Sequence, residues 1–325
     1  MKKVLNYLAY PEEYLKRIND YFKRNNYEVL YISPKDPDGK DKAIAAIQDV
    51  DVALIGSPIP RKNLEESRAK WIHIDWVGVE GVLSNELLKN HIVTNGSGRN
   101  SICLAEHVFF FAMFLEYGTR EILEAQKNHQ WGVSHKNPYE SLFSRTMLIA
   151  GTGSIAQEVA KRAKGFDMKT IGYSRSIKEN LENFDEQYAQ GEIDFAELAR
   201  RADYVVNCLP LNKDTYHLID ANVLRAMKKT AYLINISRGN IIDEDALAEA
   251  LKDNIIAGAA SDTFAREPLD SSSPLWDLDN MIITPHHTPQ SPLKFEKGVE
   301  TVITNLILFE EGKKMINVQS EKDVL

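Results

Sequence analysis

The sequence has few cysteines and no long apolar run. Its two cysteines among 325 residues, Cys103 and Cys208, lie far apart within apolar stretches, so we expect buried free thiols rather than a disulfide framework. The longest apolar run, from Val108 to Leu115, has eight residues, which is too short to span a bilayer. No signal-type segment follows Met1. We therefore expect a cytoplasmic protein.

Positive charge is also in deficit. The chain has 39 Lys and Arg against 47 Asp and Glu, a formal net charge of -8, and no local basic patch interrupts this balance. Such a surface repels polyanions, so we expect neither nucleic acid nor an anionic membrane as a partner. With 43% apolar residues the chain can bury a proper core, and its length predicts two domains.

Short β-like runs alternate with helical patterns through most of the chain. In the first hundred residues the expected strands include 4–9, 52–55 and 71–75, with an amphipathic helix at 12–25. One long helix is expected from Ser101 to about Asn128, and a second alternating series begins at 146–150. Alternation of this kind predicts parallel sheets covered by helices on both faces.

A glycine motif follows the first strand of the second series. The residues Gly151-Thr152-Gly153-Ser154-Ile155-Ala156 stand between the apolar run 147–150 and a helical pattern, the context required of a dinucleotide-binding fingerprint. Gly151 permits a tight turn, Gly153 lets the backbone approach a pyrophosphate, and Ala156 allows close helix packing. The alternative, a glycine turn without a ligand, is disfavoured by the strand–motif–helix order.

The next strand ends with residues that bear on the choice of cofactor. An acidic residue that binds the NAD ribose is expected about 20 residues after the glycines, but the chain has Ser174 followed by Arg175 there. Serine removes a carboxylate that would repel a 2′-phosphate, and a guanidinium can bind that phosphate. We predict a preference for NADP. Alternatively, Arg175 is solvated and either cofactor binds.

Three polar residues stand just beyond the ends of later predicted strands. They are Arg238, Glu267 and His286, and this edge is where open α/β sheets bind ligands. An arginine can bind a carboxylate, a histidine can transfer a proton and a glutamate can hold the histidine, so the three residues together can form a catalytic site. Taken alone, each residue has a simpler interpretation. Arg238 could form a surface ion pair, Glu267 could be a turn residue before Pro268, and His286 could be a loop histidine.

Taken together, these motifs resemble the D-isomer-specific 2-hydroxyacid dehydrogenase family, which includes glyoxylate/hydroxypyruvate reductases. The resemblance covers nearly the whole chain. In chain order its motifs are Gly78-Val79-Glu80-Gly81, Asn95-Gly96, Ala105-Glu106-His107, the glycine motif, Cys208-Leu209-Pro210 with Thr215, Asn235-Ile236-Ser237-Arg238-Gly239, Asp262 to Pro268, and Thr284-Pro285-His286.

The resemblance implies a role for each matching residue. Arg238 is expected to bind the substrate carboxylate, His286 to be the acid/base and Glu267 its hydrogen-bonded partner, while Val77 and Gly78 hold the substrate through backbone groups. No metal is expected. The implied cofactor-binding residues are Gly151, Gly153, Ser154, Ile155, Ser174, Arg175, Ser176, Cys208, Leu209, Pro210, Thr215, Ile236, Ser237, Arg238, Asp262 and His286.

The implied reaction is hydride transfer between a nicotinamide and a small 2-oxo acid, with protonated His286 donating to the ketone oxygen. The expected cofactor is NADP, with NAD possible, and the expected product is a D-2-hydroxy acid. A homodimer is expected as in the family. The alternative is a dinucleotide-sensing binding protein or corepressor that has the fold without turnover.

The resemblance also implies a discontinuous organisation. We expect a Rossmann-type doubly wound parallel-sheet domain, residues 99–289, inserted into a smaller flavodoxin-like α/β substrate domain, residues 1–98 plus 290–325. Two departures from the family pattern concern the substrate side. Glu80 stands where Asp is usual, and His287 begins a polar segment where apolar and small residues are usual.

Overall fold

The computed structural model describes residues 1–132, 141–288 and 291–324. The chain divides into two compact units: unit 1 contains residues 1–100 and 290–325, and unit 2 contains residues 101–289. Each unit has a parallel sheet of its own.

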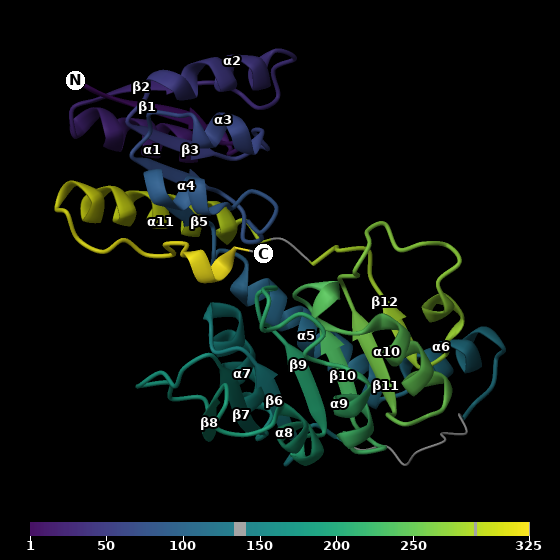
Figure 1. The fold of residues 1–325 in the computed structure, drawn as a ribbon. Coiled ribbons are helices and arrows are strands. Elements are labelled where there is room, and N and C mark those ends of the chain that lie inside the picture. Colours follow the sequence, from purple (N-terminus) through teal and green to yellow (C-terminus); the bar gives the residue numbers. More distant parts are fainter. Residues whose placement is uncertain (133–140, 289–290, 325) are drawn as a thin grey trace. The chain divides into compact units, whose positions relative to one another are not determined.

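The sheet of unit 1 has the strand order β2-β1-β3-β4-β5, and its neighbouring strands are parallel (Figure 1). This is the flavodoxin-like order, in which the direction of winding reverses beside β1. Its strands are β1 (Lys2–Tyr7), β2 (Tyr27–Tyr31), β3 (Val52–Ile55), β4 (Trp71–Ile74) and β5 (Ile92–Asn95). Its helices are α1 (Glu12–Arg24), α2 (Gly39–Ala46), α3 (Arg61–Glu65), α4 (Asn85–Asn90) and α11 (Leu293–Glu310), with one-turn 3-10 helices at Ile47–Asp49 and Glu321–Asp323.

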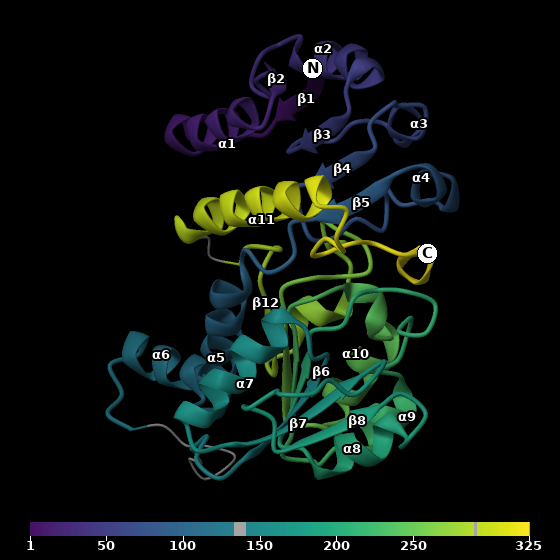
Figure 2. The ribbon, with the colours of Figure 1, turned by 90° about the vertical axis from the view of Figure 1, so that its left-hand side faces the viewer.

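The last helix completes the core of unit 1. Apolar residues at helical spacing give α11 a buried face with Val299, Val302 and Leu306, and this face packs with Val4 and Trp71 of the sheet. Helix α1 contributes to the same cluster, and Figure 2 shows α11 alongside this sheet. Because α11 follows unit 2 in the chain, unit 1 is built from both ends of the sequence.

The sheet of unit 2 has the order β8-β7-β6-β9-β10-β11-β12, again with parallel neighbours. This is the doubly wound, Rossmann-type order, so the predicted fold class is confirmed. Winding reverses between β6 and β9, where such sheets bind their ligands. The strands are β6 (Thr146–Ala150), β7 (Lys169–Ser174), β8 (Glu186–Ala189), β9 (Tyr204–Asn207), β10 (Tyr232–Asn235), β11 (Gly258–Ser261) and β12 (Met281–Ile283).

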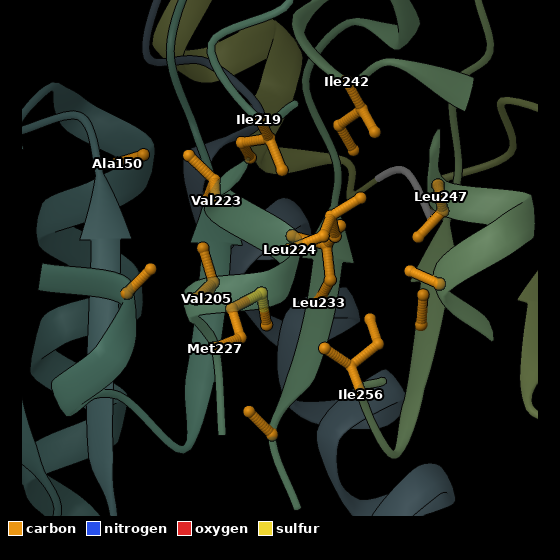
Figure 3. Packing of buried hydrophobic residues seen from close by; sticks show 14 of the residues in the cluster. Ala150, Val205, Ile219, Val223, Leu224, Met227, Leu233, Ile242, Leu247 and Ile256 are labelled. Carbon is orange, nitrogen blue, oxygen red and sulfur yellow. The ribbon is translucent and has the colours of Figure 1, made fainter. Parts of the chain in front are cut away.

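Helices cover both faces of this sheet. Helices α5 and α7 pack on one face, and α8, α9 and α10 pack on the other, where Val205, Leu224 and Leu233 lie in the cluster shown in Figure 3. The helices are α5 (Ser101–Glu116), α6 (Thr119–Lys127), α7 (Ser154–Gly165), α8 (Phe195–Arg201), α9 (Ala221–Ala226) and α10 (Glu244–Lys252), with 3-10 turns at Gly239–Ile241 and Pro274–Asp277.

One expected helix needs correction, and one strand was not predicted. The single helix expected from Ser101 to Asn128 is two helices, α5 and α6, bent by 62°, because Gly118 between them is left-handed with φ 54°. The edge strand β8 had no sequence signal, since its four residues are all half-buried and show no alternation. Among the described residues no single helix is long and apolar enough to cross a membrane. The bent pair of α5 and α6 reaches the required length and apolar composition only when the two helices are taken together.

Candidate active site

The glycine motif forms a tight turn between β6 and α7. Gly151 has φ 117°, and a Cβ at this position would lie 3.0 Å from the carbonyl oxygen of Cys208. The N–H of Gly151 donates to the carbonyl of Tyr173, at 2.6 Å. Gly153 is the N-cap of α7 and is exposed. The turn therefore brings the start of α7 to the switch point, where helix N–H groups and the helix dipole favour a phosphate.

The end of β7 lies against this turn. The Ser174 hydroxyl accepts a hydrogen bond from Oγ1 of Thr152 (3.0 Å) and donates to the carbonyl of Ser176 (2.9 Å). Arg175 and Ser176 are exposed. Sequence reasoning missed Lys178, whose Nζ donates to the carbonyl of Thr152, at 3.0 Å. Two cations thus belong to the segment that follows Ser174.

Two buried asparagines join the loops that follow β9, β10 and β11. Asn207 and Asn235, at the ends of β9 and β10, are linked by an Nδ2–Oδ1 hydrogen bond of 2.9 Å. The Asn235 amide also donates to Ser261 Oγ and Thr263 Oγ1, each at 3.2 Å. Its Oδ1 accepts from the N–H of Ser237 (3.2 Å). The sequence analysis assigned neither a role, although Asn235 begins one of the family motifs and each is a polar residue ending an apolar strand.

The segment carrying Arg238 is held by its neighbours. The Arg238 side chain is partly buried, and its Nη1 donates to the carbonyl of Ser237, at 2.8 Å. Ser237 Oγ donates to the carbonyl of Leu209. Thr215 is buried and its hydroxyl donates to the carbonyl of Pro210, at 2.7 Å. The structure therefore brings the predicted residues after β9 and β10 together through backbone and hydroxyl contacts.

Glu267 and His286 are joined by a close side-chain contact. Oε2 of Glu267 lies 2.7 Å from Nδ1 of His286, and their side chains are 36% and 55% exposed. Oε1 of the same carboxylate accepts from the N–H of Phe264, at 3.0 Å. The backbone of His286 is left-handed, with φ 49°. With Nδ1 paired to the carboxylate, the other ring nitrogen, Nε2, is the atom available for proton exchange with a substrate.

The loop of His286 is fixed by a buried carboxylate. Asp262 is 1% exposed, and it accepts hydrogen bonds from the N–H of His287 (2.8 Å) and from Oγ1 of Thr288 (2.7 Å). His107 Nε2 lies 3.8 Å from Asp262 Oδ1. Burial lowers the pKa of His107, although the Asp262 charge opposes this. Asp262, one of the expected cofactor-binding residues, therefore orders the segment that carries the acid/base candidate.

Cys208 is unsuited to nucleophilic chemistry. Burial raises the pKa of its thiol to about 12, so the group is neutral at physiological pH, and a neutral thiol is unreactive. Its side chain packs against Gly151. Among the described residues, no three His, Cys, Asp or Glu side chains are grouped so as to hold a metal ion.

The remaining predicted substrate residues belong to unit 1. Val77 and Gly78 follow β4, and the Val77 carbonyl accepts from Nδ2 of Asn95, at 2.9 Å. Gly96 lies under the same loop, because a Cβ there would be 3.0 Å from the Asp75 carbonyl. The ends of β4 and β5 therefore fix the Val77–Gly78 backbone.

A glycine turn at the switch point of a doubly wound sheet, with an Arg, Glu and His at the same sheet edge, defines a dinucleotide-dependent oxidoreductase. The chain belongs to the D-isomer specific 2-hydroxyacid dehydrogenase family, since residues 110–288 match the model of that family's NAD-binding domain. The predicted family and enzyme class are confirmed. The cofactor is a nicotinamide dinucleotide.

Similar proteins agree with this assignment. A glyoxylate reductase from Korarchaeum cryptofilum is 33% identical over 97% of this chain and 94% of its own. A D-isomer specific 2-hydroxyacid dehydrogenase family protein from Aeromonas salmonicida has a structure with a TM-score of 0.80 and 27% identity, covering 98% of this chain and 99% of its own. An acyclic imino acid reductase in complex with NADPH and D-Arg has a TM-score of 0.79 and 27% identity, covering 98% and 100%.

Proposed function

We propose that the protein reduces a small 2-oxo acid, such as glyoxylate, hydroxypyruvate or pyruvate, to its D-2-hydroxy acid and prefers NADP(H). The observation that carries this proposal is the His286–Glu267 pair at 2.7 Å. Arg238, which follows the neighbouring strand β10, supplies a cation for the substrate carboxylate. Similarity to glyoxylate reductases supports the substrate class.

The residues divide the chemistry among them. When bound, the nicotinamide supplies the hydride. The guanidinium of Arg238 binds the substrate carboxylate. Protonated His286 donates from Nε2 to the ketone oxygen, which becomes the hydroxyl. Glu267 stabilises the imidazolium and holds the neutral ring in the Nδ1–H form, which leaves Nε2 as the acceptor in the reverse direction.

The preference for NADP(H) rests on charge after β7. Ser174 offers a hydroxyl where a carboxylate would repel a 2′-phosphate, while Arg175 and Lys178 supply two cations. Similarity to a reductase solved with NADPH supports this choice. Arg175→Ala is expected to raise KM for NADPH far more than KM for NADH. Equal losses for both would remove Arg175 from 2′-phosphate binding.

A panel of 2-oxo acids tests the activity. NADPH and NADH oxidation is followed at 340 nm with glyoxylate, hydroxypyruvate, pyruvate and longer 2-oxo acids. Turnover that His286→Ala abolishes while NADPH binding persists supports the proposal. Cofactor binding without turnover on any acid would instead favour the dinucleotide-sensing binding protein, which the Glu267–His286 geometry disfavours.

We also propose a cytoplasmic homodimer without nucleic-acid or membrane partners. The net charge of -8 argues against nucleic-acid and membrane partners. The two free cysteines suit the cytoplasm. The exposed Phe110 on α5, 47% accessible, offers an apolar surface for the second subunit. Sedimentation equilibrium gives the mass in solution, and a mass of one chain would exclude the dimer.

A further inference from the structure

A second carboxylate supports the turn that carries Glu267. Glu244 is the first residue of α10, and its Oε1 accepts a hydrogen bond from the N–H of Ala265, at 2.5 Å. The helix does not need Glu244 as a cap, because Asp243 accepts from the N–H of Ala246, at 3.1 Å. The Glu244 side chain therefore binds the backbone two residues before Glu267.

Two carboxylates thus bind two consecutive backbone N–H groups. Oε1 of Glu267 accepts from Phe264, and Oε1 of Glu244 accepts from the next residue, Ala265. Charge-assisted bonds of this kind are about twice as strong as neutral ones. Because the first bond fixes one oxygen of Glu267, the geometry of the turn decides where its other oxygen points. That oxygen is the one bonded to His286.

The same turn lies directly on the backbone beside Arg238. A Cβ at Gly239 would come within 1.9 Å of the carbonyl carbon of Phe264 and 2.1 Å of the Ala265 nitrogen. Only glycine allows this approach. The stretch from Arg238 to Glu244 therefore provides the substrate-binding candidate at one end and support for Glu267 at the other.

We propose that Glu244 is a positioning residue, which holds the Phe264–Glu267 turn so that Glu267 meets Nδ1 of His286. The inference rests on the proposed function, whose acid/base pair it supports. Burial raises the pKa of Glu244, and Asp245 and Glu267 add to this, whereas the Ala265 N–H and His217 oppose it.

Three variants separate geometry from general stability. Glu244→Ala removes the acceptor of the Ala265 N–H and is expected to lower kcat for reduction about tenfold, with KM for NADPH unchanged. Glu244→Gln keeps an acceptor oxygen and restores most of kcat. Glu249→Ala, an exposed site on the same helix, is the control and leaves kcat and KM for NADPH unchanged.

A spectroscopic readout does not depend on knowing the substrate. Long-range ¹H–¹⁵N spectra, with His286 assigned by its loss in His286→Gln, report the ring tautomer. We expect the neutral His286 ring to carry its proton on Nδ1 in the wild type and in Glu244→Gln. In Glu244→Ala the fraction of rings protonated on Nε2 should increase. Glu244→Met, which keeps length without an oxygen, replaces the alanine variant if that variant does not fold.

The outcomes distinguish this inference from the proposed function. A wild type inactive on every 2-oxo acid, but with the expected tautomer change, rejects the activity and keeps the positioning role. An active wild type in which Glu244→Ala changes neither kcat nor the tautomer overturns the positioning role. Failure of Glu244→Gln to restore kcat above the alanine level also overturns it.

Discussion

Both oxygens of the Glu267 carboxylate are engaged: Oε2 lies 2.7 Å from Nδ1 of His286, and Oε1 accepts from the backbone N–H of Phe264, at 3.0 Å. One side chain therefore connects the turn after β11 with the histidine after β12. With Nδ1 bonded to the carboxylate, Nε2 is the ring nitrogen left for the proton transfer that we propose.

Replacing Glu267 with Gln should lower kcat for reduction by about 10- to 100-fold, because the imidazolium loses its charged partner. KM for the cofactor should change little. Steady-state rates at pH 7 measure both constants. Asp279→Asn, an exposed carboxylate before β12, is the control, and a Glu267→Gln variant with wild-type kcat would contradict the pairing role.

Replacing Lys178 with Ala should raise KM for NADPH at least about fivefold more than KM for NADH, since the variant loses the cation that we propose for the 2′-phosphate. Initial rates with each cofactor measure the two constants. Lys161→Ala removes an exposed cation on α7 and should leave both unchanged. If KM rises equally for both cofactors, Lys178 supports only the Thr152 carbonyl to which it donates.

Gly151→Ala should destabilise the protein by about 1–3 kcal/mol, because φ 117° is a strained conformation for alanine and the new Cβ lies 3.0 Å from the Cys208 carbonyl. Cofactor binding should weaken as well. Gly165→Ala, on the last turn of α7, is the matched control, since a Cβ there meets nothing within 4 Å. Urea unfolding and NADPH fluorescence titration measure both effects, and equal behaviour of the two variants would reject the steric argument.

Asn235→Ala should cost about 1–3 kcal/mol for each buried group left unpaired. The groups affected are Nδ2 of Asn207 and the N–H of Ser237, which both donate to Asn235 Oδ1. Because Ser237 precedes Arg238, KM for the 2-oxo acid should also rise. Urea denaturation and substrate saturation curves check the two effects separately. A destabilised variant with wild-type KM would show that the network supports the fold but not Arg238.

Asp185→Asn should lower stability in a pH-dependent way. Burial alone would raise the pKa of the Asp185 carboxyl, but hydrogen bonds from Lys164 and Thr170 hold it below the ordinary value of 3.8. A lowered folded-state pKa contributes stability that is present above the unfolded value and is lost as pH falls through the folded value. Tm should therefore differ between variant and wild type at pH 7 and converge below pH 3.8. A difference independent of pH would contradict this.

Local sequence context was enough to predict the dinucleotide-binding turn, since the conformation of Gly151 follows from a strand, a glycine and a helix in order. Arg238, Glu267 and His286 could be placed at the right sheet edge by their positions after strands. The pairing of Glu267 with His286 joins two loops whose residues lie 19 apart in the sequence, a contact that periodicity cannot give. The resemblance supplied the roles.

The features that the sequence did not reveal are buried polar contacts and the left-handed backbone of one glycine. Asn207 and Asn235 were given no role because a buried asparagine acquires its partners only when neighbouring strands come together. Lys178 was overlooked because its contact with Thr152 requires β6 and β7 to be adjacent. Gly118 ends a helix whose apolar pattern gave no sign of a break, through a positive φ that composition does not reveal.

The two-part construction of unit 1 affects how the protein folds as it is made. Val4 and Trp71 are synthesised early, but α11, which covers them, follows the whole of unit 2. At about 5–20 residues per second, the roughly 190 residues of unit 2 take about 10–40 s to synthesise. Unit 2 can therefore form its core on the ribosome while the first sheet still lacks one of its covering helices. During that interval the first hundred residues are the part of the nascent chain most exposed to chaperones and to aggregation.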